Sequence, residues 1–211
     1  MGKLLATISL LLICYNSFGQ SDSLKNKYLS IGSRTSGICF GNSSNYNGLR
    51  FNLLDNETER INGINISFLA MTEKTNGVQI GGLAAHTTRI NGLSLAPVWQ
   101  NSEKSNGLGV SFGIDSDTLN GVFAGFAVAP PNANIDNRVI NGLAMGVFVG
   151  AEKVRGMAIG LFHIYSKKQV GLSVSAINRT DDLRGLQIGL LNYAGNNPKL
   201  LRWLPLINFH V

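Results

Sequence analysis

The sequence predicts an all-β protein, built as an antiparallel repeat barrel of about 10–12 short strands. Ten glycines recur along the chain at a nearly constant interval of about 15 residues, and only the interval from Gly121 to Gly142 is longer. After each glycine, large apolar residues alternate with variable residues, which is the period-two pattern of a β-strand. Charged residues gather between these alternating segments. This distribution predicts strands that are joined by short polar turns.

The repeating unit has the form Asn-Gly followed by an apolar, a variable and an apolar residue. Asn precedes the glycine in seven units, whereas Arg155, Val170 and Arg184 replace it in the last three. The fourth residue after the glycine is Gly, Ala or Ser in nine units, and Asn52 is the exception. The ten repeat glycines, called head glycines below, are Gly48, Gly63, Gly77, Gly92, Gly107, Gly121, Gly142, Gly156, Gly171 and Gly185.

The N-terminal segment predicts export. Lys3 precedes the apolar run Leu4–Cys14, and Ser17-Phe18-Gly19 then forms a small-x-small cleavage pattern. The apolar run is shorter than the roughly 20 residues of a membrane-spanning helix, so residues 1–19 are assigned to a cleaved signal peptide. Lipidation at Cys14 is the alternative. Residues 20–35 are assigned to an N-terminal linker and residues 36–211 to the β-repeat domain, in the periplasm, outer membrane or cell surface.

The polar runs between the units, such as Met71–Lys74, are interpreted as the turns. Polar and charged residues are disfavoured inside strands, so Asn-Gly is placed at the start of each strand, where glycine supplies a kink or a bulge. Residues 36–42 and 203–211 are expected to add a strand at each end. The long interval between Gly121 and Gly142 contains residues 129–138, which are expected to form one extended loop.

Two further arrangements remain open at this stage. The large apolar residues either point into a filled barrel, which is the favoured arrangement, or outward into lipid, as in an outer-membrane barrel. A parallel β-solenoid is the alternative architecture, because one repeat unit can complete one coil if it bends into two or three shorter strands. The direction of the large apolar residues decides between the two barrels, whereas strands that all run one way would exclude both.

The units "NGLAMGVFVGAEKVRGMAIGLFH" and the C-terminal "LRGLQIGLLNYAGNNPKLLRWLPLINFHV" resemble bacterial glycine-rich surface-repeat proteins. The resemblance covers roughly residues 36–211 and implies an exported chain of NG-[LIV]-x-[LIV]-G units. It also implies a β-flower architecture, which is a shallow antiparallel barrel that has been likened to a lipid-binding domain. The family implies no catalytic residues, and fold alone does not fix function.

No chemical motif names an activity, so no catalytic, cofactor-binding or metal-binding residue is predicted. His86, His163 and His210 lack the spacing of a metal site or a catalytic triad. The aspartate pairs at 115, 117 and at 181, 182 are interpreted as solvated turn charges rather than Ca²⁺ ligands. Cys39 is interpreted as a small apolar strand residue. Lys167, Lys168 and the loop at 129–139 are the candidate binding surfaces.

These observations predict a non-enzymatic, exported envelope protein that acts as a structural or binding module at the membrane surface. The net charge of +6 suits an anionic surface, with membrane lipid or other envelope components as partners. Nucleic acid is not an expected partner, because the basic residues are scattered and no recognition motif is present. The alternatives are an outer-membrane barrel channel, a solenoid adhesin and, last, an enzyme.

Overall fold

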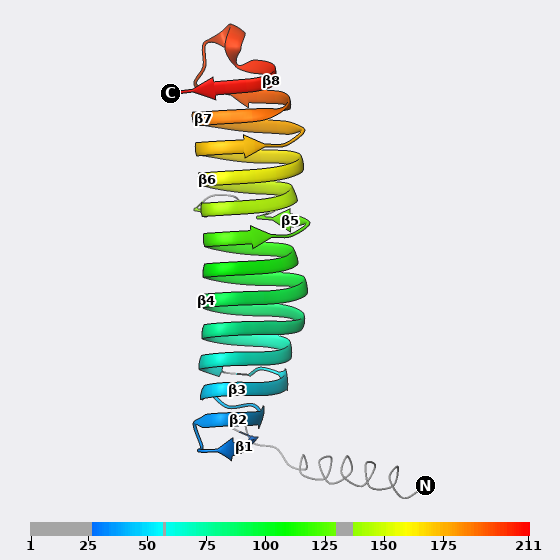
Figure 1. Ribbon diagram of the computed structural model, residues 1–211, viewed down its shortest axis with the longest axis vertical. Coiled ribbons are helices and arrows are strands. Elements are labelled where there is room, and N and C mark those ends of the chain that lie inside the picture. Colours follow the sequence, from blue (N-terminus) through cyan, green and yellow to red (C-terminus); the bar gives the residue numbers. More distant parts are fainter. Residues whose placement is uncertain (1–26, 57, 130–136) are drawn as a thin grey trace, which may run out of the picture.

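The protein is a parallel β-solenoid, in which the chain winds into coils stacked along one long axis (Figure 1). The computed structural model describes residues 27–56, 58–129 and 137–211. The elements are β1 (Tyr28–Gly32), β2 (Ser36–Gly41), β3 (Asn45–Leu54), β4 (Thr58–Ala124), β5 (Ala127–Val128), β6 (Val139–Val174), β7 (Ile177–Ala194), η1 (Lys199–Leu201) and β8 (Trp203–His210).

Strand pairing follows the repeat. β2, β3, β4, β6 and β7 pair with one another in parallel, and the head glycines of neighbouring coils face each other, as in Gly48↔Gly63 and Gly171↔Gly185. β1 pairs with β2 and β7 pairs with β8 in antiparallel fashion, so an antiparallel strand closes each end. The prediction of an all-β fold is confirmed. The prediction of an antiparallel barrel is wrong, and the alternative of a parallel solenoid is the architecture found.

Each coil is a three-cornered loop rather than a single long strand. In the coil from 77 to 91, five residues point inward, and they are Gln79, Gly81, Ala85, Thr87 and Ile90. Two or three outward residues separate Gly81 from Ala85, Thr87 from Ile90, and Ile90 from the next inward residue. Because a straight strand alternates strictly, these outward runs mark the bends of the coil. The bends return the chain to its starting edge within one repeat.

The three corners recur at fixed positions relative to the head glycine. The Asn-Gly corner holds the head glycine and the residue before it. The apolar corner holds the fifth and sixth residues after the glycine, such as Phe68 and Leu69. The charged corner holds the fourth and third residues before the next glycine, such as Glu73 and Lys74. The apolar side, defined by the first and third residues after the glycine, joins the Asn-Gly corner to the apolar corner.

The polar run Met71–Lys74 belongs to strand β4, so its interpretation as a hairpin turn is wrong. Thr72 and Thr75 point into the solenoid, whereas Glu73 and Lys74 point outward between them. The run still bends the chain. It forms one corner of a coil, however, and does not reverse the direction of the chain. The next strand therefore runs parallel to the previous one.

The Asn-Gly pairs lie at a corner because the backbone there is accessible only to glycine. All ten head glycines have φ between +117° and +137°, a region that L-residues rarely adopt. A Cβ on Gly77 would overlap the carbonyl oxygen of Gly63 in the preceding coil. The glycine therefore supplies both the bend and the close approach of two coils.

The asparagines before these glycines form a ladder along the same corner. From Asn62 onward, each side-chain amide donates a hydrogen bond to the side-chain oxygen of the asparagine in the preceding coil, over 2.6–2.8 Å. The ladder consists of Asn47, Asn62, Asn76, Asn91, Asn106, Asn120 and Asn141. Stacking in register, rather than turn formation, therefore accounts for asparagine at these positions.

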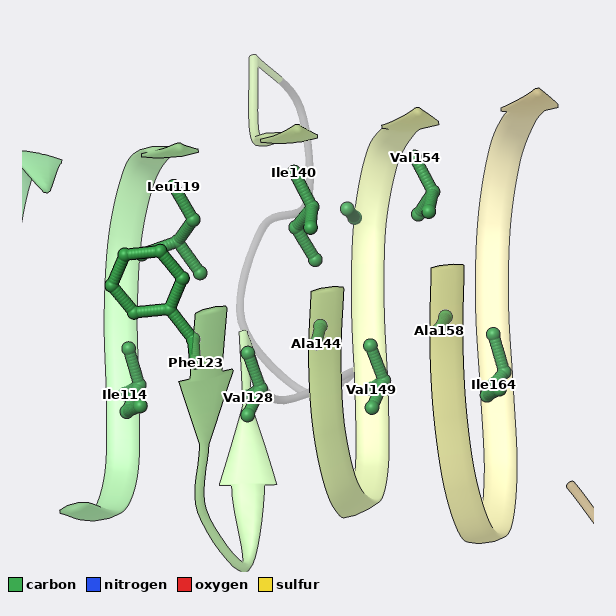
Figure 2. Close-up of a cluster of buried hydrophobic side chains, with 11 residues drawn as sticks. Ile114, Leu119, Phe123, Val128, Ile140, Ala144, Val149, Val154, Ala158 and Ile164 are labelled. Atoms are coloured by element: carbon green, nitrogen blue, oxygen red, sulfur yellow. The ribbon is translucent and has the colours of Figure 1, made fainter. Parts of the chain in front are cut away.

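The interior is narrow and changes character along the axis. Around the junction of β4, β5 and β6 it is aliphatic, and Phe123 packs with Ile114, Leu119, Val128 and Ile140 (Figure 2). Nearer the N-terminus it is small and polar. There Ala70, Ala85 and Ala96 form a small cluster beside hydrogen-bonded glutamine and threonine side chains. Packing of one coil on the next, and not a thick apolar core, thus holds the fold together.

The ends of the chain refine the predicted boundaries. β1 lies within residues 20–35, the segment assigned to an N-terminal linker, so residues 28–32 extend the sheet beyond the predicted repeat domain. The predicted end strands are confirmed as β2 and β8. The signal peptide, Cys14 and residues 130–136 of the predicted loop lie outside the described residues.

Candidate functional site

The apolar side points outward along the solenoid. Leu108 and Val110 expose 52% and 51% of their surface, while Gly109 between them is buried. The same alternation holds in the other coils, where the second residue after the head glycine points inward. Placement of the large apolar residues inside a filled barrel is therefore wrong.

The size of the interior explains this orientation. The inward positions on this side are the second and fourth after the glycine, and the sequence supplies mostly Ser, Ala, Gly and Gln there. The Phe123 ring fits inside the solenoid because the facing residue in the preceding coil is Gly109. A Cβ added to Gly109 would lie 2.6 Å from the Phe123 ring. A coil as short as one repeat unit encloses too little space for an aliphatic side chain at every inward position.

The apolar corner extends this surface. Four aromatic rings from successive coils contact one another along it. Phe112 stacks on Phe126 at 4.7 Å between ring centroids, and the Phe126–Phe148 and Phe148–Phe162 pairs meet edge to face at 5.8 Å. Exposed residues continue the corner toward both ends of the solenoid, and they include Leu53, Leu54, Phe68, Leu83, Val98, Leu161, Leu190 and Leu191. Aromatic contacts thus order an exposed ridge of the molecule.

The apolar side and the apolar corner together form one continuous surface, called the apolar strip below. No charged residue occupies any of its positions, which are the first, third, fifth and sixth after each head glycine. With coils about 4.8 Å apart and residues about 3.3 Å apart, the strip measures roughly 40 Å by 15 Å, or about 600 Å². A contiguous apolar patch of that size marks an interaction surface. The charged corner is not part of the strip.

Lys167 and Lys168, the predicted binding residues, lie at the charged corner and outside the apolar strip. The Lys168 ammonium forms an ion pair of 2.9 Å with Asp182 in the next coil. The hydrogen bond from Lys168 keeps the pKa of Asp182 below its usual value. The second predicted surface, the loop at 129–139, is described only at its ends, where Arg138 forms an ion pair of 2.6 Å with Asp115.

The remaining candidate residues are dispersed. His86 is exposed on β4, His163 lies half-buried on β6 with a pKa lowered by burial, and His210 Nδ1 lies 2.7 Å from Asn197 Oδ1. Within the described residues no three His, Cys, Asp or Glu side chains converge on a metal site.

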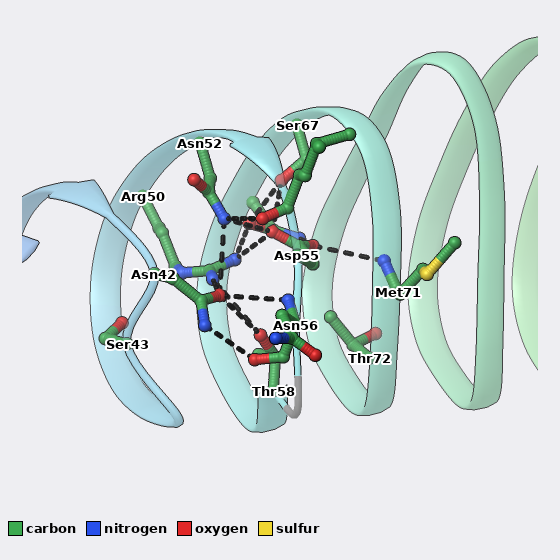
Figure 3. Close-up of polar contacts among 12 residues, drawn as sticks. Asn42, Ser43, Arg50, Asn52, Asp55, Asn56, Thr58, Ser67, Met71 and Thr72 are labelled. Atoms are coloured by element: carbon green, nitrogen blue, oxygen red, sulfur yellow. Dashed lines mark hydrogen bonds and ion pairs between the residues drawn. The ribbon is translucent and has the colours of Figure 1, made fainter. Parts of the chain in front are cut away.

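Arg50 is a cation inside the solenoid. Its guanidinium forms a buried ion pair of 2.6 Å with Asp55 and also donates hydrogen bonds to Asn42, Thr58 and Asn65 (Figure 3). Asp55 accepts further hydrogen bonds from Asn52, Asn65, Ser67 and the backbone of Met71. Charges with so many partners hold the first coils together, so the network has a structural role.

Cys39 is buried against Tyr46 and Ile61, and burial raises the pKa of its thiol. A buried, protonated thiol is a poor nucleophile, so we expect slow reaction with a maleimide in the native protein and rapid reaction in denaturant. Peptide mass spectrometry of the Cys39 fragment measures both rates. Equal rates would contradict the burial of this residue.

In the described residues there is no helix long and apolar enough to cross a membrane. The resemblance to glycine-rich surface-repeat proteins stays a prediction. No protein-family model, curated protein or solved structure matches the chain.

Proposed function

We propose that the protein is a non-enzymatic, exported envelope protein that binds a membrane surface through its apolar strip. The observation that carries this proposal is the outward orientation of the large apolar residues along the solenoid. The predicted signal peptide at residues 1–19 supports export to a compartment where a bilayer surface is within reach.

A bilayer is the partner that suits the shape of this surface. The strip is long and uniform, and none of its positions in the described coils carries a charged side chain that would orient a folded partner. An amphipathic element of this kind lies in the membrane plane, with its apolar face at the boundary of the acyl chains and its charged face in water. The solenoid axis would accordingly lie parallel to the membrane, with the acidic residues of the charged corner toward solvent.

Flotation with vesicles of phosphatidylcholine and phosphatidylglycerol tests the proposal. The protein is expected to float with the vesicles, and a variant carrying Leu108→Gln and Phe112→Gln is expected to bind at least about tenfold more weakly, since both side chains lose favourable transfer into lipid. Both residues are about half exposed, so the fold is retained.

The matched control carries Leu200→Gln and Leu201→Gln, which change two exposed apolar residues on η1, away from the strip. This control is expected to bind like the unchanged protein. Failure of the unchanged protein to float, or equal binding by both variants, would contradict the proposal. A stable dimer in light scattering, abolished by the Leu108 and Phe112 changes, would assign the strip to a second copy instead.

A further inference from the structure

Charges at the charged corner are sorted by sign. The fourth residue before the head glycine is acidic in most coils, and these residues are Glu59, Glu73, Glu103, Asp117, Glu152 and Asp181. The third residue before it is basic in most coils, and these residues are Arg60, Lys74, Arg89, Lys104, Lys153 and Lys168. Two adjacent rows of opposite sign therefore run along the solenoid.

The basic row lies on the side of the corner that leads to the apolar strip. The first apolar position of the next coil follows four positions later, along a backbone path of at most about 14 Å. Arg155 and Arg184 continue the basic character at the Asn-Gly corner itself, directly beside the apolar side, where the asparagine ladder has ended. The acidic row lies one residue farther from the strip. One edge of the strip is thus flanked by positive charge.

In the described coils, most of these basic side chains are not held in ion pairs, although Arg184 acts electrostatically on Asp182. Lys168 forms an ion pair with Asp182, but within the part of the chain that the structure describes the other basic residues at this edge form none. These residues, called the basic stripe, are Arg60, Lys74, Arg89, Lys104, Lys153, Arg155 and Arg184. In the first half of the solenoid four of them come from successive coils stacked about 4.8 Å apart. Like charges at that spacing repel one another. The adjacent acidic row offsets part of this repulsion, and an anionic surface would relieve the rest.

We infer that the basic stripe binds the phosphates of anionic lipids at the edge of the membrane-bound apolar strip. The inference rests on the proposed function and adds the lipid class and the edge that faces the headgroups. Lys and Arg side chains beside an apolar face reach the headgroup layer of a bilayer and are attracted by its negative surface potential. The acidic row, on the far side of the corner, then faces solvent.

Vesicles of phosphatidylcholine alone, compared with vesicles that also contain phosphatidylglycerol, test the inference. The protein is expected to bind the anionic vesicles more tightly, and raised salt is expected to reduce that preference. Each neutralised basic residue near the surface weakens binding about fivefold, so Lys74→Gln with Lys104→Gln is expected to weaken binding to anionic vesicles by about 25-fold. The same variant is expected to bind phosphatidylcholine as the unchanged protein does.

The matched control, Arg34→Gln with Lys199→Gln, removes the same net charge from exposed residues outside the stripe. It is expected to keep most of the affinity, and circular dichroism verifies that both variants are folded. Equal binding of the unchanged protein to both vesicle types would overturn the inference while leaving the proposed function intact. Equal losses of affinity in the stripe variant and the control variant would overturn it as well. If the unchanged protein bound neither vesicle type, the proposed function itself would be overturned.

Discussion

Replacing Gly107 by Ala is expected to disrupt the solenoid at its middle. Gly107 has φ of +121°, and its added Cβ would overlap the carbonyl oxygen of Gly92 in the preceding coil. The unfavourable backbone conformation and the clash with backbone atoms together are expected to cost at least about 3 kcal/mol of the free energy of unfolding. Chemical denaturation followed by circular dichroism measures the change.

Gly82→Ala is the matched control. Gly82 is exposed on the same strand β4, its φ is not positive, and an added Cβ would meet Phe68 at 3.1–3.2 Å. A small adjustment of the Phe68 ring relieves part of that contact, so we expect a much smaller loss of stability. In a solenoid each coil contacts only its neighbours, and limited proteolysis is therefore expected to cut the Gly107 variant near residues 92–107 first. Equal stability of the two variants would contradict the close stacking of the head glycines.

Removal of Asp55 is expected to unfold the N-terminal coils. Asp55→Ala leaves Arg50 as a buried cation without its ion-pair partner and deprives Asn52, Asn65 and Ser67 of an acceptor. Breaking a buried ion pair from one side costs about 3–5 kcal/mol. Denaturation monitored by circular dichroism gives the size of the loss. Hydrogen exchange shows where stability is lost, because the amides of β3 are expected to lose protection.

A double variant separates two contributions to the lost stability: the cost of burying the Arg50 charge without a partner, and the loss of the Arg50–Asp55 ion pair itself. Arg50→Met with Asp55→Leu removes both charges, and its destabilisation is expected to be smaller than the sum of the two single changes. Lys168→Gln breaks the exposed ion pair with Asp182 and serves as the matched control, with an expected loss of at most about 1 kcal/mol. A loss for Asp55→Ala as small as that of the control would contradict the burial of the network.

Much of the local structure is readable from the sequence. The period of the head glycines defines the coils, and the alternation after each glycine correctly separates one face of large apolar residues from one of small and mixed residues. The candidate site is harder to find. Lys167 and Lys168 stand out as an adjacent basic pair, whereas the basic stripe becomes visible only when residues one repeat apart are aligned by coil.

The barrel prediction fails at a particular physical step. It treats about nine residues of each unit as one straight strand of roughly 30 Å, too long for the remaining residues to return. The head glycine at positive φ and the bend after the fourth residue break that length into short pieces. Asn-Gly is therefore neither a hairpin turn nor a plain strand start. It is the corner at which one coil stacks on the next.

The sequence by itself determined the β-class, the repeat length, the coil-to-coil equivalence of the glycines and the composition of each face. These properties depend on local conformational preferences and on the period of the hydrophobic pattern, and both can be recognised from the order of the residues. Only the tertiary structure decided that the strands run parallel and that the large apolar face points outward. The large apolar side chains point outward because a coil encloses too little space to hold them. That space is set by the number of residues in one coil and by the places at which the chain bends, and the coil closes only when residues one full repeat apart stack on each other.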